Sequence, residues 1–90
     1  MNKTTLILLS IAVTLTETSA FNQSPERFEG ECFIGMKTRC MLAGSGYFDR
    51  YKKGENKQES LNDAIANYKK ACELGEKKGC KKVKELSSIQ

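Results

Sequence analysis

The chain has 90 residues, of which 15 are Lys or Arg, 11 are Asp or Glu and none is His, so its net charge at pH 7 is +4. This charge is too mild to predict a nucleic-acid-binding protein, whose affinity depends on neutralising many phosphates. The absence of His excludes catalysis by an imidazole base and disfavours a zinc site.

The first 20 residues are typical of a secretory signal peptide. Lys3 precedes an apolar run over residues 6–15, and the segment ends in Thr18-Ser19-Ala20, with small residues at the positions that signal peptidase reads. The run is shorter than the roughly 20 apolar residues of a membrane-spanning helix. We therefore expect residues 1–20 to be a signal peptide and residues 21–90 to be a secreted or periplasmic domain without a transmembrane segment. The alternative is a retained membrane anchor or a buried N-terminal helix.

Two helices are predicted in the first half of this domain. One runs from about residue 25 to 35, because Ser24-Pro25-Glu26 offers a cap, a Pro at the first helical position and an acid near the helix N-terminus. The next runs over about 38–53, because small and apolar side chains follow Cys40 at the spacing of one helical face. That face consists of Ala43, Gly44, Tyr47, Phe48 and Tyr51.

A third helix is predicted to start near residue 61 and to stop at Gly75. Ser60 is its expected N-cap, and Gly75 can adopt the positive φ of a helix C-terminus. Its apolar face consists of Leu61, Ala64, Ile65, Tyr68 and Cys72. We expect Gly54 and residues 55–59 to form the turn before it.

A last short helix is predicted over about 79–88, after Cys80. The segment after residue 20 has no run of alternating β-branched residues and a single Pro, so nothing predicts a strand. The sequence therefore predicts an all-α fold.

An internal repeat appears when the chain is aligned with itself at a shift of 40 residues. Residues 31–40 read ECFIGMKTRC and residues 71–80 read ACELGEKKGC, so both Cys, the Gly between them and the aliphatic residue before that Gly coincide. A hairpin repeat cannot bury its apolar face alone and stacks on its neighbours. We expect one full α-helical hairpin flanked by two half units.

The four Cys are expected to form disulfides, because a small exported domain needs covalent support for its core. Three pairings are possible, and the repeat favours Cys32–Cys40 and Cys72–Cys80, since equivalent positions should form equivalent bonds. Each bond would join the end of one helix to the beginning of the next. The spacing of seven residues disfavours a zinc site, and no Cys-x-x-Cys motif predicts redox catalysis, so we expect neither a metal nor another cofactor.

Residues 64–80, AIANYKKACELGEKKGC, resemble the signature of Sel-one-like repeats in the disulfide-bearing form of the Helicobacter cysteine-rich proteins. The chain departs from that family in having only Gly54 in the turn of the hairpin, and in a short insertion between Cys40 and Cys72. The resemblance implies an α/α solenoid related to tetratricopeptide repeats, with a right-handed superhelix and a concave binding face.

The repeat architecture and the missing catalytic groups predict a binding module. It would be an exported, disulfide-stabilised monomer that binds a protein or another component of the cell envelope and has no catalytic site of its own. The candidate binding residues are Tyr47, Tyr51, Tyr68, Lys69 and Lys70. Ordinary core packing is the other interpretation of the three Tyr.

The resemblance also implies an alternative, penicillin binding or weak β-lactam hydrolysis. A serine β-lactamase needs Ser-x-x-Lys together with Ser-Asp-Asn and Lys-Thr-Gly elements. None of Ser24, Ser45 and Ser60 has a Lys three positions later, and no Lys-Thr pair is followed by Gly. A further possibility is association with acidic partners or an anionic envelope surface through the seven lysines of residues 69–84.

Overall fold

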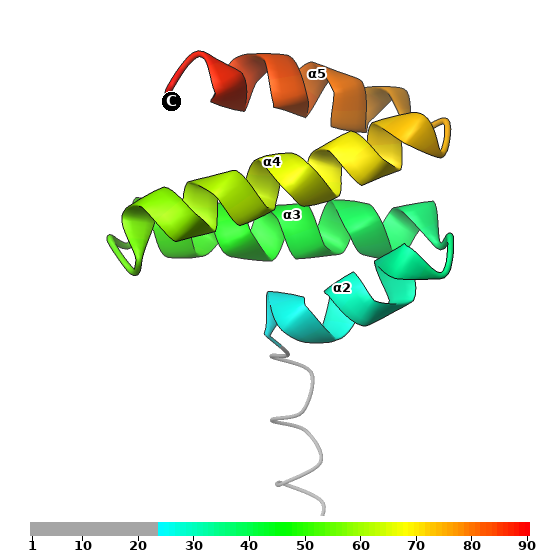
Figure 1. Cartoon of the computed structure of the whole chain (residues 1–90), viewed down its shortest axis with the longest axis horizontal. Helices are drawn as coiled ribbons and strands as arrows, with labels where there is room; N and C mark the ends of the chain where they lie inside the picture. Colours follow the sequence, from blue (N-terminus) through cyan, green and yellow to red (C-terminus); the bar gives the residue numbers. More distant parts are fainter. Residues whose placement is uncertain (1–23) are drawn as a thin grey trace, which may run out of the picture.

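The computed structural model describes residues 24–90, so the predicted signal peptide lies outside the described residues. Within this range the chain forms four helices and no strand, which confirms the all-α prediction for this part of the protein. The helices are α2 (Pro25–Phe33), α3 (Lys37–Lys52), α4 (Lys57–Glu73) and α5 (Lys77–Ser87). Figure 1 shows them side by side in chain order, with α3 and α4 as an antiparallel pair in the middle.

The chain turns between α2 and α3, and again between α4 and α5, through two corners 40 residues apart, residues 34–36 and 74–76. Gly35 has a φ of 99° and Gly75 a φ of 100°, which an L side chain rarely adopts. Met36 and Glu76, which follow them, have φ of −89° in both cases and ψ of 91° and 102°. The two corners therefore have nearly the same backbone conformation.

A disulfide spans each corner, and both predicted bonds are present. Cys32 is joined to Cys40 with their Cα atoms 4.5 Å apart. Cys72 is joined to Cys80 with their Cα atoms 4.7 Å apart. The first disulfide is fully buried and the second is half-buried. Each bond ties the last turn of one helix to the first turn of the next.

The predicted start of α4 near residue 61, with Ser60 as its N-cap, is wrong. The helix begins at Lys57, after Asn56, whose φ of 44° and ψ of 54° are left-handed. Asn tolerates this conformation better than most side chains, so the chain reverses within residues 53–56 instead of the predicted 54–59. The Ser60 hydroxyl lies inside the helix and donates a hydrogen bond of 2.7 Å to the Glu55 carbonyl.

The last helix also begins earlier than its expected start at residue 79. Glu76 is its N-cap, and the carboxylate of Glu76 accepts a hydrogen bond of 3.4 Å from the Lys78 backbone N–H. At the other end of the described chain, α2 stops at Phe33 rather than at 35, because Gly35 already has the positive φ that ends a helix. Ser24 and Pro25 occupy the predicted positions at its start.

The main core lies among α3, α4 and α5. Its buried members are Tyr47, Leu61, Ala64, Tyr68 and Leu86. Two glycines allow these helices to approach each other closely. A Cβ at Gly44 of α3 would lie 2.8 Å from the Tyr68 ring, and a Cβ at Gly79 of α5 would lie 2.7 Å from the Tyr68 carbonyl oxygen. The absence of side chains at these glycines therefore sets how closely α3 and α5 pack against α4.

Candidate functional site

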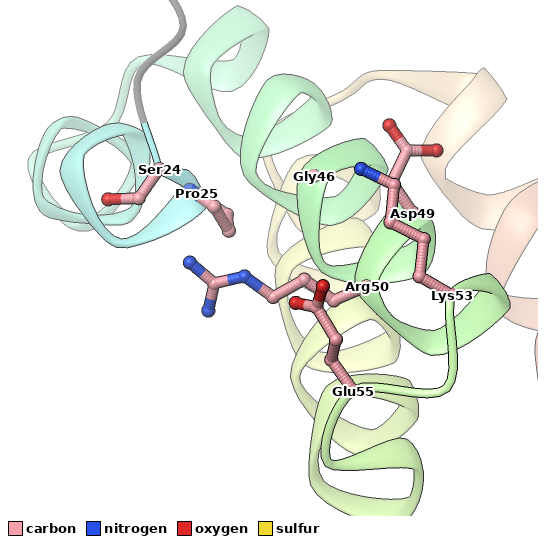
Figure 2. Close-up of a pocket in the computed structure, with 7 residues that line it drawn as sticks. All are labelled: Ser24, Pro25, Gly46, Asp49, Arg50, Lys53 and Glu55. Atoms are coloured by element: carbon pink, nitrogen blue, oxygen red, sulfur yellow. The ribbon is translucent and has the colours of Figure 1, made fainter.

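A pocket of about 500 Å³ lies between the beginning of α2 and the C-terminal half of α3. The residues that line this α2/α3 pocket are Ser24, Pro25, Gly46, Asp49, Arg50, Lys53 and Glu55. Figure 2 shows Arg50 reaching from α3 towards Pro25 of α2, with Glu55 of the α3–α4 turn beside it. Gly46 lets α2 approach, because a Cβ there would lie 2.9 Å from the Pro25 Cβ.

Arg50 is held in one orientation by a carboxylate of α2. Its two terminal nitrogens donate hydrogen bonds of 2.7 and 2.9 Å to the two carboxylate oxygens of Glu26, a paired geometry that fixes both side chains. These hydrogen bonds lower the pKa of Glu26 from its ordinary 4.5 to about 2. The guanidinium also lies 5.7 Å from the centre of the Tyr47 ring. One wall of the pocket is therefore an arginine side chain of fixed orientation, whose charge is paired with that of Glu26.

The lining of the pocket is balanced in charge. Arg50 and Lys53 are cationic, whereas Asp49 and Glu55 are anionic. The pocket thus offers cationic donors and anionic acceptors, and Pro25 and Gly46 also line it. Such a surface complements a polar polypeptide segment better than a simple anion or cation.

A second polar cluster fixes α2 against the hairpin. The Tyr47 hydroxyl donates a hydrogen bond of 3.0 Å to Glu29, and the Asn67 side-chain amide donates one of 2.8 Å to the other carboxylate oxygen of Glu29. Burial and, next, the Glu29 carboxylate raise the pKa of Tyr47 above its ordinary 10. Burial, followed by the charge of Glu29, also raises the pKa of Asp63. Through Glu29, helix α2 is linked to both α3 and α4.

The Arg50–Glu26 pair makes stability depend on pH. Because the pKa of Glu26 is lowered, the folded protein binds this proton less tightly than the unfolded chain, so stability rises with pH between about 2 and 4.5. The stabilisation should be complete above pH 4.5 and disappear as pH falls towards 2. Both side chains are partly exposed, which limits the effect to about 1 kcal/mol or less.

Thermal unfolding across this pH range checks this expectation. Glu26→Gln should remove part of the loss of stability below pH 4.5, whereas Glu59→Gln, an exposed acid of α4, should retain it. Equal pH dependence in the native protein and the Glu26→Gln variant would contradict a stabilising role for the pair.

The structure places the five predicted binding residues in three different surroundings. Tyr47 and Tyr68 are buried in the core, as the packing interpretation expects. Tyr51 is half-buried and stacks on Phe48, with ring centres 5.7 Å apart. Lys69 is exposed and Lys70 is half-buried near the C-terminus of α4, the end of the hairpin far from the α2/α3 pocket. The five residues do not form one site.

The pocket residue Arg50 and its partner Glu26 were missed by sequence reasoning, as was Glu29. Their pairing joins positions 24 residues apart, which no short motif connects. One local signal was available: Asn67 precedes Tyr68 and follows Ala64 by three positions on the apolar face of α4. A polar side chain in such a place requires a hydrogen-bond partner from another element.

Ser24 and Lys53 both line the α2/α3 pocket, but within residues 24–90 no hydrogen bond joins a serine hydroxyl to a lysine side chain. Of the serine hydroxyls, those of Ser60 and Ser88 donate to the backbone carbonyls of Glu55 and Glu85. Over residues 24–90, no group of three or more His, Cys, Asp or Glu is placed to hold a metal ion. Among the helices of this part of the chain, none is long and apolar enough to cross a membrane.

Comparison with known proteins finds no family model, no curated protein and no solved structure that matches this sequence. The resemblance to Sel-one-like repeats therefore stays a prediction that rests on residues 64–80.

Proposed function

We propose that this chain is an exported helical repeat module, related to Sel-one-like repeats, that binds a polypeptide segment of another protein and has no catalytic site of its own. Its binding site is the α2/α3 pocket. The observation that carries the proposal is the pocket itself, which is open to solvent, balanced in charge and walled by an arginine already held in place by Glu26.

The two corners support the repeat architecture. Segments 40 residues apart end a helix, turn through a glycine of positive φ and start the next helix with nearly equal dihedral angles. In both corners the glycine N–H donates to the carbonyl of the first Cys, over 2.9 Å at Gly35 and 3.0 Å at Gly75. A hairpin between half units is the arrangement expected of a short solenoid, in which neighbouring units share a core.

Export is supported by the two disulfides, since such bonds form and persist in oxidising compartments. Binding by a preformed pocket is favoured by the rigidity that the Cys32–Cys40 bond and the Glu29 hydrogen bonds give to α2. A ligand that meets a rigid site loses less affinity to ordering of the protein.

Affinity capture from a cell-envelope extract under non-reducing conditions tests the proposal. The decisive variant exchanges two pocket charges, Lys53→Glu with Glu55→Lys, and so preserves the net charge. The matched control makes the same exchange at Lys84 and Glu85, which are exposed near the C-terminus of α5 and do not line the pocket. We expect the native chain and the control variant to retain the same protein from the extract. The pocket variant should bind that protein at least about tenfold more weakly.

The captured protein must also bind the purified chain directly, with the same difference between the two variants. If every protein retained by the native chain is retained equally by the pocket variant, the α2/α3 pocket is not a binding site for polypeptides.

A further inference from the structure

Large apolar side chains are exposed at the first corner of the fold. Phe33 is 69% exposed, Ile34 77% and Met36 44%. They lie within four consecutive residues at the junction of α2 and α3, whereas the other exposed large apolar side chains, Leu42 and Ile89, are separate from them in sequence. Three such side chains on a protruding turn form an apolar tip rather than a groove.

The second corner lies beside this tip. Figure 1 shows both corners at the same end of the molecule, opposite the turn between α3 and α4. The contacts agree, because Ala71 and Leu74 of the second corner region pack against the Cys32–Cys40 disulfide. Residues 31–40 and 69–81 thus form one continuous surface, which we name the corner edge.

The corner edge also holds the positive charge of the protein. Its two segments contain seven basic and three acidic side chains, whereas residues 49–63 at the opposite end contain four of each. Two of the three acids are engaged: Glu31 forms an ion pair of 3.1 Å with Arg39, and Glu76 caps α5. Five lysines of this edge are exposed and form no ion pair in the described chain: Lys37, Lys69, Lys77, Lys78 and Lys81.

We propose that the corner edge docks on the surface of a bilayer that contains anionic phospholipids. The apolar tip would enter the interface between headgroups and acyl chains, while the surrounding lysines contact the headgroups. Apolar side chains that protrude between cationic ones are the pattern of proteins that lie on membranes. An acidic protein would satisfy the lysines but would need a hollow to receive Phe33 and Ile34.

This inference does not rest on the proposed function, because the α2/α3 pocket lies at the other end of the α3–α4 hairpin. A lipid surface also explains why exposed apolar side chains and exposed lysines occur together on the corner edge. Each lysine close to an anionic bilayer raises affinity about fivefold, and each buried large apolar side chain raises it about tenfold or more. These contributions to the binding free energy add only when all these residues face the same plane. The corner edge places them on one surface.

Co-sedimentation of the purified disulfide-bonded chain with vesicles tests the proposal. We expect binding to vesicles of equal parts phosphatidylglycerol and phosphatidylcholine, and little binding to phosphatidylcholine alone. Raising the salt concentration from about 0.1 to about 1 M shortens the screening length from about 10 to about 3 Å and should weaken binding strongly.

Two variants of the corner edge separate the two contributions. Phe33→Ser with Ile34→Ser should weaken vesicle binding about a hundredfold or more, since the apolar surface of both side chains no longer enters the interface. Lys77→Gln with Lys78→Gln should weaken it about 25-fold.

Each variant has a matched control at the other end of the molecule. Ile89→Ser removes an exposed Ile, and Lys52→Gln with Lys57→Gln removes two lysines from residues 49–63 that do not line the pocket. Both controls should bind within about twofold of the native chain, because neither site faces the bilayer. Thermal unfolding verifies that all four variants are folded.

Three results would overturn the proposal. One is equal binding to neutral and anionic vesicles, and another is an equal loss in the variants and their controls. The third is binding that free polyglutamate abolishes and that the Phe33/Ile34 variant leaves unchanged, which would assign the edge to an acidic polypeptide.

Discussion

Replacing Cys72 and Cys80 together by Ala is expected to lower the free energy of unfolding by about 2.5 kcal/mol, the loop-closure estimate for a bond that closes nine residues. The physical reason is the unfolded chain, which gains conformational freedom when the bond is absent. A domain of this size has a net stability of only about 5 kcal/mol, so the expected loss is a large part of the whole.

The same replacement of Cys32 and Cys40 should cost more. These two Cys are fully buried and pack against Ala71, so their removal leaves a cavity in addition to the loss of the cross-link. Urea unfolding followed by far-ultraviolet circular dichroism measures both effects. If both variants unfold at the same urea midpoint as the native chain, neither bond contributes to stability. If the variant without the half-buried Cys72–Cys80 bond loses more free energy of unfolding than the variant without Cys32–Cys40, the packing argument is contradicted.

Gly79→Ala is expected to destabilise the protein by about 1–3 kcal/mol, the usual cost of an extra methyl group in a packed interface. Its Cβ would lie 2.7 Å from the Tyr68 carbonyl oxygen and 2.9 Å from the Ala71 Cβ. The nearest of these is a backbone atom, so α5 must move away from α4 to accommodate it. This cost exceeds the intrinsic preference of Ala for helices, which is about 1 kcal/mol.

Gly30→Ala is the matched control, because Gly30 lies inside α2 and a Cβ there meets nothing within 4 Å. It should stabilise the protein by about 0.5–1 kcal/mol through the lower entropy of the unfolded chain and the better helix propensity of Ala. Chemical unfolding of the two variants compares them directly. If Gly79→Ala were as stable as Gly30→Ala, the contact between α4 and α5 would be looser than the structure describes.

The disulfide pairing could be predicted because the internal repeat makes the two Cys units equivalent, and the helices could be predicted because their signals are local. Apolar residues at helical spacing, a Pro after Ser24, and Gly35 and Gly75 after the last helical turns depend on neighbouring residues only. The start of α4 was wrong because two signals competed. Ser60 has the chemistry of an N-cap, yet Asn56 could adopt a left-handed conformation and start the helix one turn earlier.

The candidate site could not be predicted, because its residues meet only when α2 packs on the hairpin. Arg50 reaches Glu26 across 24 residues, and Asn67 reaches Glu29 across 38. Helical periodicity predicts the face of α3 that carries Tyr47. It does not predict which polar side chain of α2 lies opposite that face. The exposed tip at Phe33 and Ile34 was missed for the same reason, since exposure depends on what the fold places around these residues.

The hydrogen bonds of Glu29 have a consequence for how the first described helix is positioned. A displacement of α2 by one turn along its axis would strand the Tyr47 hydroxyl and one hydrogen of the Asn67 amide without acceptors. An unsatisfied buried polar group costs about 1–3 kcal/mol, so alternative registers of this helix are disfavoured even though its apolar contacts are few. The Glu29 carboxylate thereby acts together with the Cys32–Cys40 bond and the Arg50–Glu26 pair to give α2 one alignment on the hairpin.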